Sequence, residues 1–283
     1  MGRRTSTRFV AGTTVADALA AARTVNQLGM AVSIDNLGEN VTQASEARQS
    51  AALYHELLDD ISVNRLDANV SLKLTHMGLD VDEELATELV SGLVAKAAAN
   101  GNFVRVDMEG SPYTERTLGF VRALHRAPGN QGRVGAVIQA YLYRSEKDAA
   151  TLLGERIRIR LCKGAYNEPP EIAFPHKPDV DANYVKLMKM LLKSSIYHGI
   201  ATHDEKMIAA TIDFARAERI PPEAFEFQML YGIRRDLQQQ LVREGWRMRV
   251  YIPFGTEWYP YLMRRLAERP ANVLFIARNL LRG

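Results

Sequence analysis

Apolar and polar positions along this 283-residue chain follow a repeating rhythm of short extended runs and longer amphipathic stretches. The extended runs have the pattern of strands, whereas the longer stretches have apolar residues at helical spacing. We predict eight strands, at Met30–Asp35, Asn69–Leu74, Phe103–Met108, Ala136–Leu142, Arg156–Cys162, Gly199–His203, Ala224–Leu230 and Met248–Pro253. Between them we predict helices that include Val81–Ala99, Thr114–Arg126, Asn183–Tyr197, Glu205–Arg219 and Arg234–Arg243.

Two segments depart from this rhythm. Val15–Leu28 has a helical pattern ahead of the first strand and predicts a short arm packed on the main domain. Asn167–Asp181 contains four of the eleven prolines and predicts a long irregular loop that is functional or mobile rather than structural. Two local signals mark helix boundaries: Ser145-Glu-Lys-Asp148 has the form of a capping box, and Asn100-Gly101 has the form of a helix end.

Strands that alternate with helices predict parallel pairing, because each parallel strand needs a crossover connection. Eight such units in about 250 residues match a closed (β/α)8 barrel of the TIM type. The alternative is an open doubly wound sheet, which in dinucleotide-binding proteins has a G-x-G-x-x-G turn that this chain lacks. We therefore predict a barrel over residues 30–283, preceded by an N-terminal helical arm over residues 1–29.

Composition excludes several classes of protein. The chain is 47% hydrophobic and 24% charged, as in ordinary globular proteins, and its formal net charge of +3 gives no argument for nucleic-acid binding. Its single cysteine, Cys162, excludes an intrachain disulfide. The sequence has no apolar run of about 18 residues, no secretory signal pattern and no metal-ligand spacing among its histidines. We expect a cytoplasmic globular protein without a bound metal or a transmembrane segment.

The predicted strands carry polar residues on the face that points into the barrel, where Val, Ile and Leu are usual. The apolar residues occupy the other face, which must pack against the outer helices. The inward charged residues are five cations, Lys73, Arg105, Arg158, Arg160 and Arg249, and three anions, Asp35, Asp107 and Glu226. Because a buried charge needs a partner, the surplus of two cations predicts an anionic ligand, such as a phosphate or a carboxylate.

Position along the strands separates structural from functional charges. We interpret Arg105 and Arg158 as members of structural ion pairs low in the barrel. Lys73, Asp107 and Arg160 lie at the carboxyl ends of their strands, where the active sites of such barrels are found, and we interpret them as functional.

Four segments resemble the motifs of one enzyme family. They are Arg160-Leu-Cys-Lys-Gly-Ala-Tyr166, Ala201-Thr-His203, Phe225-Glu-Phe-Gln-Met-Leu230 and Tyr261-Leu-Met-Arg-Arg265. In this order they resemble proline dehydrogenase, a flavoenzyme found alone or as a domain of larger bifunctional proteins. The resemblance implies a distorted (β/α)8 barrel, in agreement with the strand count. It also implies a monofunctional enzyme, because the other domains of the bifunctional proteins have no counterpart here.

The family oxidises L-proline to Δ1-pyrroline-5-carboxylate by hydride transfer to the flavin N5 of FAD, the first step of proline catabolism to glutamate. The resemblance also implies a quinone as electron acceptor, reached by peripheral contact at the inner face of the membrane. A site for this reaction needs a clamp for the carboxylate, an apolar wall for the ring and hydrogen-bond donors around the flavin.

The resemblance implies Asp107 and Arg160 as catalytic residues. In the family pattern Asp107 pairs with the ammonium of proline, and Arg160 stabilises the anionic reduced flavin. Arginines suit the carboxylate clamp because they stay charged and bind carboxylates through two hydrogen bonds. The implied substrate-binding residues are Lys73, Asp107, Leu230, Tyr251, Tyr261, Arg264 and Arg265.

The predicted cofactor-binding residues are Met108, Gln139, Arg160, Lys163, Gly164, Ala165, Thr202, His203 and Gln228. We expect Gly164 to allow close approach of the backbone to the cofactor, and Lys163 to suit a ribose or a phosphate. Two positions depart from the family pattern. Asn167 stands where bifunctional members often carry an aromatic residue, and Cys162, which we place on the outward face, replaces an aliphatic residue.

Two other functions remain open on the residues alone. One is a barrel lyase or aldolase that uses Lys73 or Lys163 as a Schiff-base amine. The other is a ligand-binding barrel with a phosphate site and no turnover.

Overall fold

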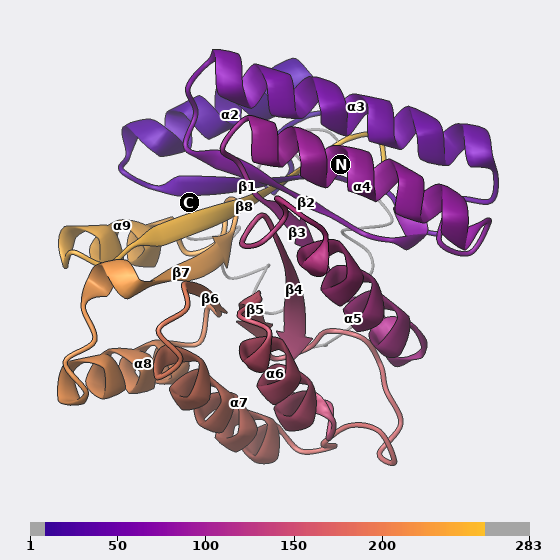
Figure 1. Cartoon of the computed structure of the whole chain (residues 1–283). Coiled ribbons are helices and arrows are strands. Elements are labelled where there is room, and N and C mark those ends of the chain that lie inside the picture. The colour runs from indigo at the N-terminus through magenta and orange to yellow at the C-terminus, as the bar shows by residue number, and fades with distance from the viewer. Residues whose placement is uncertain (1–8, 258–283) are drawn as a thin grey trace, which may run out of the picture.

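The computed structural model of the chain describes residues 9–257, which form a closed barrel of eight parallel strands (Figure 1). Neighbouring strands pair in sequence order, and β1 closes the barrel by pairing with β8. The strands are β1 (Ala31–Asn36), β2 (Ala68–Leu72), β3 (Val104–Val106), β4 (Val134–Gln139), β5 (Arg158–Cys162), β6 (His198–Ala201), β7 (Phe225–Leu230) and β8 (Met248–Phe254). Each overlaps one predicted strand, so the predicted (β/α)8 barrel is confirmed.

Helices follow the strands and cover the outside of the barrel (Figure 1). They are α2 (Val15–Gln27), α3 (Ala44–Val63), α4 (Glu83–Ala99), α5 (Ser111–Arg126), α6 (Ser145–Gly154), α7 (Lys177–Leu192), α8 (Glu205–Ala217) and α9 (Arg235–Arg243), with the short 3-10 helices η1 (Thr75–Met77) and η2 (Pro222–Ala224). None of the helices within residues 9–257 is both long enough and apolar enough to cross a membrane.

The start of α7 differs from the prediction. The helix begins at Lys177 rather than at Asn183, because Pro178 occupies its first turn. A proline is tolerated there, since the first N–H groups of a helix have no intrahelical partner. The predicted loop Asn167–Asp181 is therefore too long, and its last residues belong to the helix.

The two helix-boundary signals had different outcomes. Asn100 is the C-cap of α4, and Gly101 follows it with a φ of 67°, as the sequence predicted. The capping box predicted at Ser145 is wrong. Ser145 is already helical, its hydroxyl donates to the carbonyl oxygen of Leu142 (2.6 Å), and Arg144 is the N-cap.

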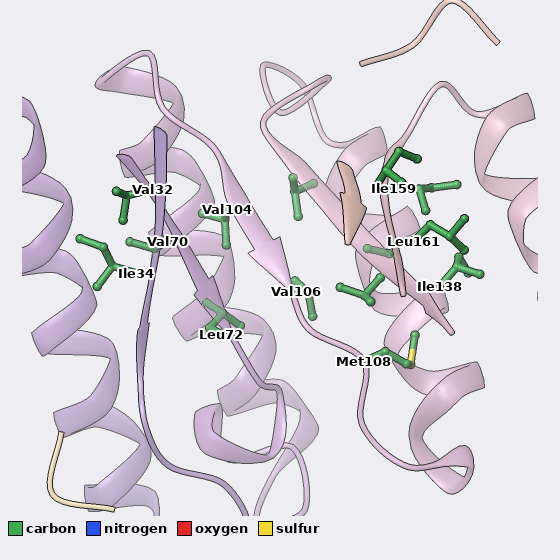
Figure 2. Packing of buried hydrophobic residues seen from close by; sticks show 14 of the residues in the cluster. Val32, Ile34, Val70, Leu72, Val104, Val106, Met108, Ile138, Ile159 and Leu161 are labelled. Atoms are coloured by element: carbon green, nitrogen blue, oxygen red, sulfur yellow. The ribbon is translucent and has the colours of Figure 1, made fainter. Parts of the chain in front are cut away.

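Apolar side chains on the outward faces of the strands form the main core. Figure 2 shows members of this set on β1 to β5, among them Val32, Ile34, Val70, Leu72, Val104, Val106, Ile138, Ile159 and Leu161. All of these are nearly completely buried. Because side chains alternate along a strand, the residues between them point into the barrel and place charged groups near its axis.

Helix α2 packs against β1 and β8, where the first and last strands meet (Figure 1). Its start is fixed by a capping box: the Thr14 hydroxyl accepts from the Asp17 N–H (3.1 Å), and the Asp17 carboxylate accepts from the Thr14 N–H (3.0 Å). Ala18 and Ala22 of its inner face are fully buried. The division into an arm of residues 1–29 and a barrel of residues 30–283 stays a prediction.

Candidate active site

A cavity of about 260 Å³ lies among the carboxyl ends of the strands, the end at which (β/α)8 barrels carry their active sites. Of the sixteen predicted site residues, Tyr261, Arg264 and Arg265 lie outside residues 9–257. The other thirteen all line this cavity: Lys73, Asp107, Met108, Gln139, Arg160, Lys163, Gly164, Ala165, Thr202, His203, Gln228, Leu230 and Tyr251. The structure therefore brings them together, while their individual roles stay predictions.

Five residues that were not among the predicted site residues also line the cavity: Val137, Cys162, Tyr166, Ala201 and Met229. Our outward placement of Cys162 is wrong. Residues two apart on a strand share a face, so Cys162 points inward with Arg160, as Val137 does with Gln139. Strand parity was the signal that could have found both residues.

Asp107 lies at the centre of the cavity's hydrogen bonds. Its Oδ1 accepts from the Arg160 guanidinium (2.6 Å) and from the Ser71 hydroxyl (2.7 Å). Its Oδ2 accepts from the Tyr251 hydroxyl (2.8 Å). Arg160 also lies over the Tyr251 ring, 5.2 Å from its centroid. An ionised carboxylate accepts about four hydrogen bonds, so these three donors leave Asp107 room for one more.

Lys73 supplies a second charge pair beside the first. Its Nζ donates to Oδ2 of Asp35 at 3.3 Å, and both side chains are largely buried. Burial lowers the pKa of Lys73, but the carboxylates of Asp35 and Asp107 outweigh burial and raise the pKa above its ordinary value. Lys73 is therefore a permanent cation at neutral pH.

A chain of hydrogen bonds runs from the cavity along the inside of the barrel. Arg160 Nε donates to Gln228 Oε1 (2.5 Å), and Gln228 Nε2 donates to Glu226 Oε1 (2.6 Å). Arg249 Nε donates to the same oxygen of Glu226 (2.7 Å). Burial alone would raise the pKa of Glu226, but Arg249 lowers it below its ordinary value. Glu226 therefore stays ionised and neutralises Arg249.

The predicted surplus of two cations lies at the other end of the barrel. Three cations are paired: Lys73 with Asp35, Arg160 with Asp107 and Arg249 with Glu226. The remaining two, Arg105 and Arg158, form no salt bridge within the described part of the chain. Our interpretation of these two as structural ion pairs is therefore wrong.

The rim of the cavity carries a cluster of opposite charges. Lys163 Nζ donates to Asp181 and, at 2.6 Å, to Asp204, and the exposed Lys177 contacts the same two carboxylates. Burial would raise the pKa of Asp204, but the contacts with Lys163 lower it to about 2. The cluster thus joins the turn after β5 to the starts of α7 and α8.

Gly164, next to Lys163, has a φ of 107°, a conformation that side chains of L-residues rarely adopt. A Cβ there would also overlap the Tyr141 ring. The structure therefore gives a packing reason for glycine at this position, whatever the cofactor requires.

The polar residues at the end of β4 and directly after β6 form hydrogen bonds with the backbone. Gln139 Nε2 donates to the Glu109 carbonyl oxygen (2.8 Å), and the Thr202 hydroxyl accepts from the Asp204 N–H (3.0 Å). His203 Nε2 accepts from the Leu230 N–H (3.0 Å), which requires the proton of a neutral imidazole to lie on Nδ1. Within residues 9–257, no group of three or more His, Cys, Asp or Glu residues is arranged to hold a metal ion.

A closed parallel barrel with paired cations and carboxylates at its carboxyl end defines a (β/α)8-barrel enzyme for a small charged substrate. The model of the family described as proline dehydrogenase matches residues 18–278. Proline dehydrogenase 1 of Bacillus subtilis subsp. natto is 41% identical over 275 residues, which cover 97% of this chain and 90% of that protein. The proline dehydrogenase of Deinococcus radiodurans is 41% identical over 279 residues, with coverages of 98% and 90%. The chain belongs to the proline dehydrogenase family, and the predicted membership is confirmed.

A solved structure agrees with this assignment. Proline utilization A from Bdellovibrio bacteriovorus matches the fold with a TM-score of 0.87 and 28% sequence identity. The match covers 93% of this chain and 32% of that longer chain, so the similarity concerns about a third of that protein.

Proposed function

We propose that the chain is an FAD-dependent enzyme that oxidises L-proline to Δ1-pyrroline-5-carboxylate, the first step of proline catabolism. The observation that carries the proposal is the hydrogen-bonded pair of Asp107 and Arg160 in the carboxyl-end cavity of a proline dehydrogenase-family barrel. Proline is a zwitterion, so its site must offer both signs of charge. Lys73 and Asp107 offer them side by side.

The residues of the cavity fit a flavin. An isoalloxazine ring needs hydrogen-bond donors along its polar edge and apolar groups against its faces. Arg160, Gln139 and Gln228 supply donors, and Met108 and Leu230 supply apolar surface. The amide and hydroxyl groups of Lys163–Ala165 and Thr202 at the rim suit the ribose and phosphates of FAD. When bound, FAD supplies the acceptor for the hydride.

The protein's own groups bind and orient the substrate. Asp107 has one acceptor position left for the substrate amine, and the donors from Arg160, Ser71 and Tyr251 keep its carboxylate fixed in place. Lys73 supplies a cation for the substrate carboxylate, and Arg264 and Arg265 complete the clamp in this proposal. Leu230 and Tyr251 bound the space for the ring, with Tyr261 from the same segment as the clamp.

The contacts of both candidate lysines argue against the Schiff-base alternative. An amine must lose its proton to attack a carbonyl. The raised pKa of Lys73 keeps it protonated, and Lys163 is held between the carboxylates of Asp181 and Asp204. A lyase would need a neutral lysine in the same cavity. Lys73 does not fulfil this condition, and the amine of Lys163 is occupied by its contacts with two carboxylates.

The visible spectrum of the purified protein before and after anaerobic addition of L-proline tests the proposal. We expect a yellow protein whose flavin absorbance near 450 nm bleaches within the turnover time, because the cofactor accepts the hydride. A flavin that stays oxidised contradicts turnover and favours a ligand-binding barrel. A colourless protein that borohydride links covalently to a carbonyl compound favours the lyase.

We further propose that the electrons pass to a quinone, reached by peripheral contact with the membrane. The family resemblance supports this acceptor, and no described helix spans a membrane. Proline-dependent reduction of a short-chain ubiquinone analogue, compared with reduction of oxygen, measures the preference. Faster turnover with oxygen than with the quinone contradicts this proposal and leaves the oxidation of proline unaffected.

A further inference from the structure

A second cavity, of about 530 Å³, lies among the amino ends of the strands, at the opposite end of the barrel from the candidate active site. Its size falls within the range of roughly 300–1,000 Å³ that small-molecule sites occupy. Two carboxylates, Asp67 and Glu226, line it. Five arginines line it as well: Arg65, Arg105, Arg133, Arg158 and Arg249. The described lining therefore has a surplus of three positive charges.

Arg105 is the most deeply buried of these cations, with 4% of its surface exposed. Its Nη1 donates to the carbonyl oxygens of Ala136 and Arg158, both at 2.8 Å. Its Nε is buried and has no hydrogen-bond partner within residues 9–257. A buried charged donor without an acceptor is costly, so an anion in this cavity would stabilise the arrangement.

Arg158 lies between two aromatic rings. Its guanidinium carbon is 5.3 Å from the centroid of Phe103 and 5.6 Å from that of Tyr197. Arg105 lies over the same Phe103 ring, at 4.7 Å. Aromatic faces hold the plane of a guanidinium while its edge of N–H donors stays available. The two arginines that lack a carboxylate partner are thus held by aromatic rings and backbone.

Electrostatics argue in the same direction. Burial lowers the pKa of Arg105, and the nearby charge of Arg160 lowers it further. Burial likewise lowers the pKa of Arg158. A neighbouring cavity of about 500 Å³ shares Arg158 and Arg249 and adds Arg247 to the same side of the barrel. This end of the barrel therefore presents an electropositive surface that the protein itself leaves uncompensated.

We propose that the amino-end cavity binds a small polyanion that carries phosphate groups. Phosphate groups hold two charges in a compact form, and each matches the fork of N–H donors on an arginine. The surplus of three charges and the volume fit a ligand of pyrophosphate size or larger rather than a single carboxylate. The site goes beyond the proposed function, because proline oxidation uses the opposite end of the barrel.

Calorimetric titration of the flavin-loaded protein with inorganic pyrophosphate tests the proposal. We expect one binding site per chain, an affinity that falls with added salt, and no loss of flavin absorbance during the titration. The variant Arg158→Gln should weaken binding about tenfold or more, since it removes a charge-assisted contact. Arg133→Gln, on a half-buried residue, is a second variant should Arg158→Gln fail to fold.

The matched control is Arg216→Gln, which removes the same charge from the exposed side of α8 and should leave pyrophosphate affinity unchanged. ATP and citrate provide two further titrations. A phosphate site is supported if ATP binds and the affinity for citrate is at least tenfold weaker than that for ATP. Citrate as tight as pyrophosphate overturns the assignment to phosphate. The proposed site is overturned if pyrophosphate does not bind at millimolar concentration. It is also overturned if Arg216→Gln loses as much pyrophosphate affinity as Arg158→Gln.

Discussion

Arg160 and Asp107 form a hydrogen-bonded ion pair across the inside of the barrel, with 2.6 Å between Arg160 Nη1 and Asp107 Oδ1. Arg160 lies on β5 and Asp107 directly follows β3, and these two strands are not neighbours in the sheet. Each partner has further contacts: Arg160 donates to Gln228, and Asp107 accepts from Ser71 and Tyr251. These contacts therefore fix the positions of both side chains where they face the cavity.

The variant Asp107→Asn removes the charge while it keeps the shape of the side chain. We expect kcat/KM for proline to fall by about 10–150-fold, because charge-assisted hydrogen bonds contribute roughly 1.5–3 kcal/mol. Flavin content should be retained. Steady-state kinetics with an artificial electron acceptor provide the measurement. Asp59→Asn on the exposed side of α3, which also removes a paired carboxylate, is the control. An unchanged kcat/KM in Asp107→Asn would contradict the proposed role.

Gly164→Ala tests the turn after β5. The positive φ and the overlap of the new Cβ with Tyr141 should lower the free energy of unfolding by about 1–3 kcal/mol and weaken flavin binding. Urea denaturation and flavin content measure the two effects. Gly119→Ala in α5 is the matched control, since a Cβ there meets no atom within 4 Å. Alanine should raise helix stability there by roughly 0.5–1 kcal/mol, so equal effects of the two variants would be inconsistent with our account.

His198 predicts a pH dependence of stability. Its Nδ1 accepts from the Ile159 N–H (3.0 Å), and its Nε2 lies 2.9 Å from the Ser194 hydroxyl, so protonation would break the first bond. Burial lowers the pKa of His198 from 6.5 to about 3. Between these values the unfolded chain binds a proton that the folded protein does not. Stability therefore falls as the pH falls from about 6.5 towards 3, by up to about 1.4 kcal/mol per pH unit.

The variant His198→Gln should reduce the slope of the free energy of unfolding against pH. Part of the slope should persist, because burial also lowers the pKa of His76, to about 4. Urea unfolding at pH 7, 6 and 5 gives the free energies. The exposed His176 offers the matched control His176→Gln, whose free energy of unfolding should change with pH as it does in the unmodified protein. If His198→Gln also shows the same change with pH as the unmodified protein, His198 is not the cause of the pH dependence.

Arg264→Met tests the predicted carboxylate clamp, which lies outside the described residues. We expect the KM for proline to rise by about 10–150-fold with the flavin still bound, because the variant loses a bidentate contact to the substrate. Kinetics and the visible spectrum together measure both quantities. Loss of flavin in place of a raised KM would mean that this arginine serves the cofactor.

The sequence could predict the barrel and the lining of its carboxyl end, because both depend on local patterns. Alternation along a strand identifies the residues that point into the barrel, and distance from the strand's end shows how near they lie to its carboxyl end. These two patterns are sufficient to predict that Lys73, Asp107 and Arg160 lie in one site. Partnerships across the barrel depend on distant segments. For that reason the sequence could not show that Arg160 meets Asp107, nor that Arg105 and Arg158 would be left without carboxylates. Pro178 misled the prediction because proline marks both loops and first helical turns.

Closure of the barrel has a consequence for the order in which the chain folds. Strand β1 finds its second neighbour only in β8, more than 200 residues later, from Ala31↔Arg249 to Asn36↔Phe254. During synthesis one edge of β1 therefore stays unpaired until nearly the whole chain has left the ribosome, and an open edge can pair with other chains. Helix α2 contacts both of these strands, so its packing surface on the barrel is complete only when β8 has closed that edge.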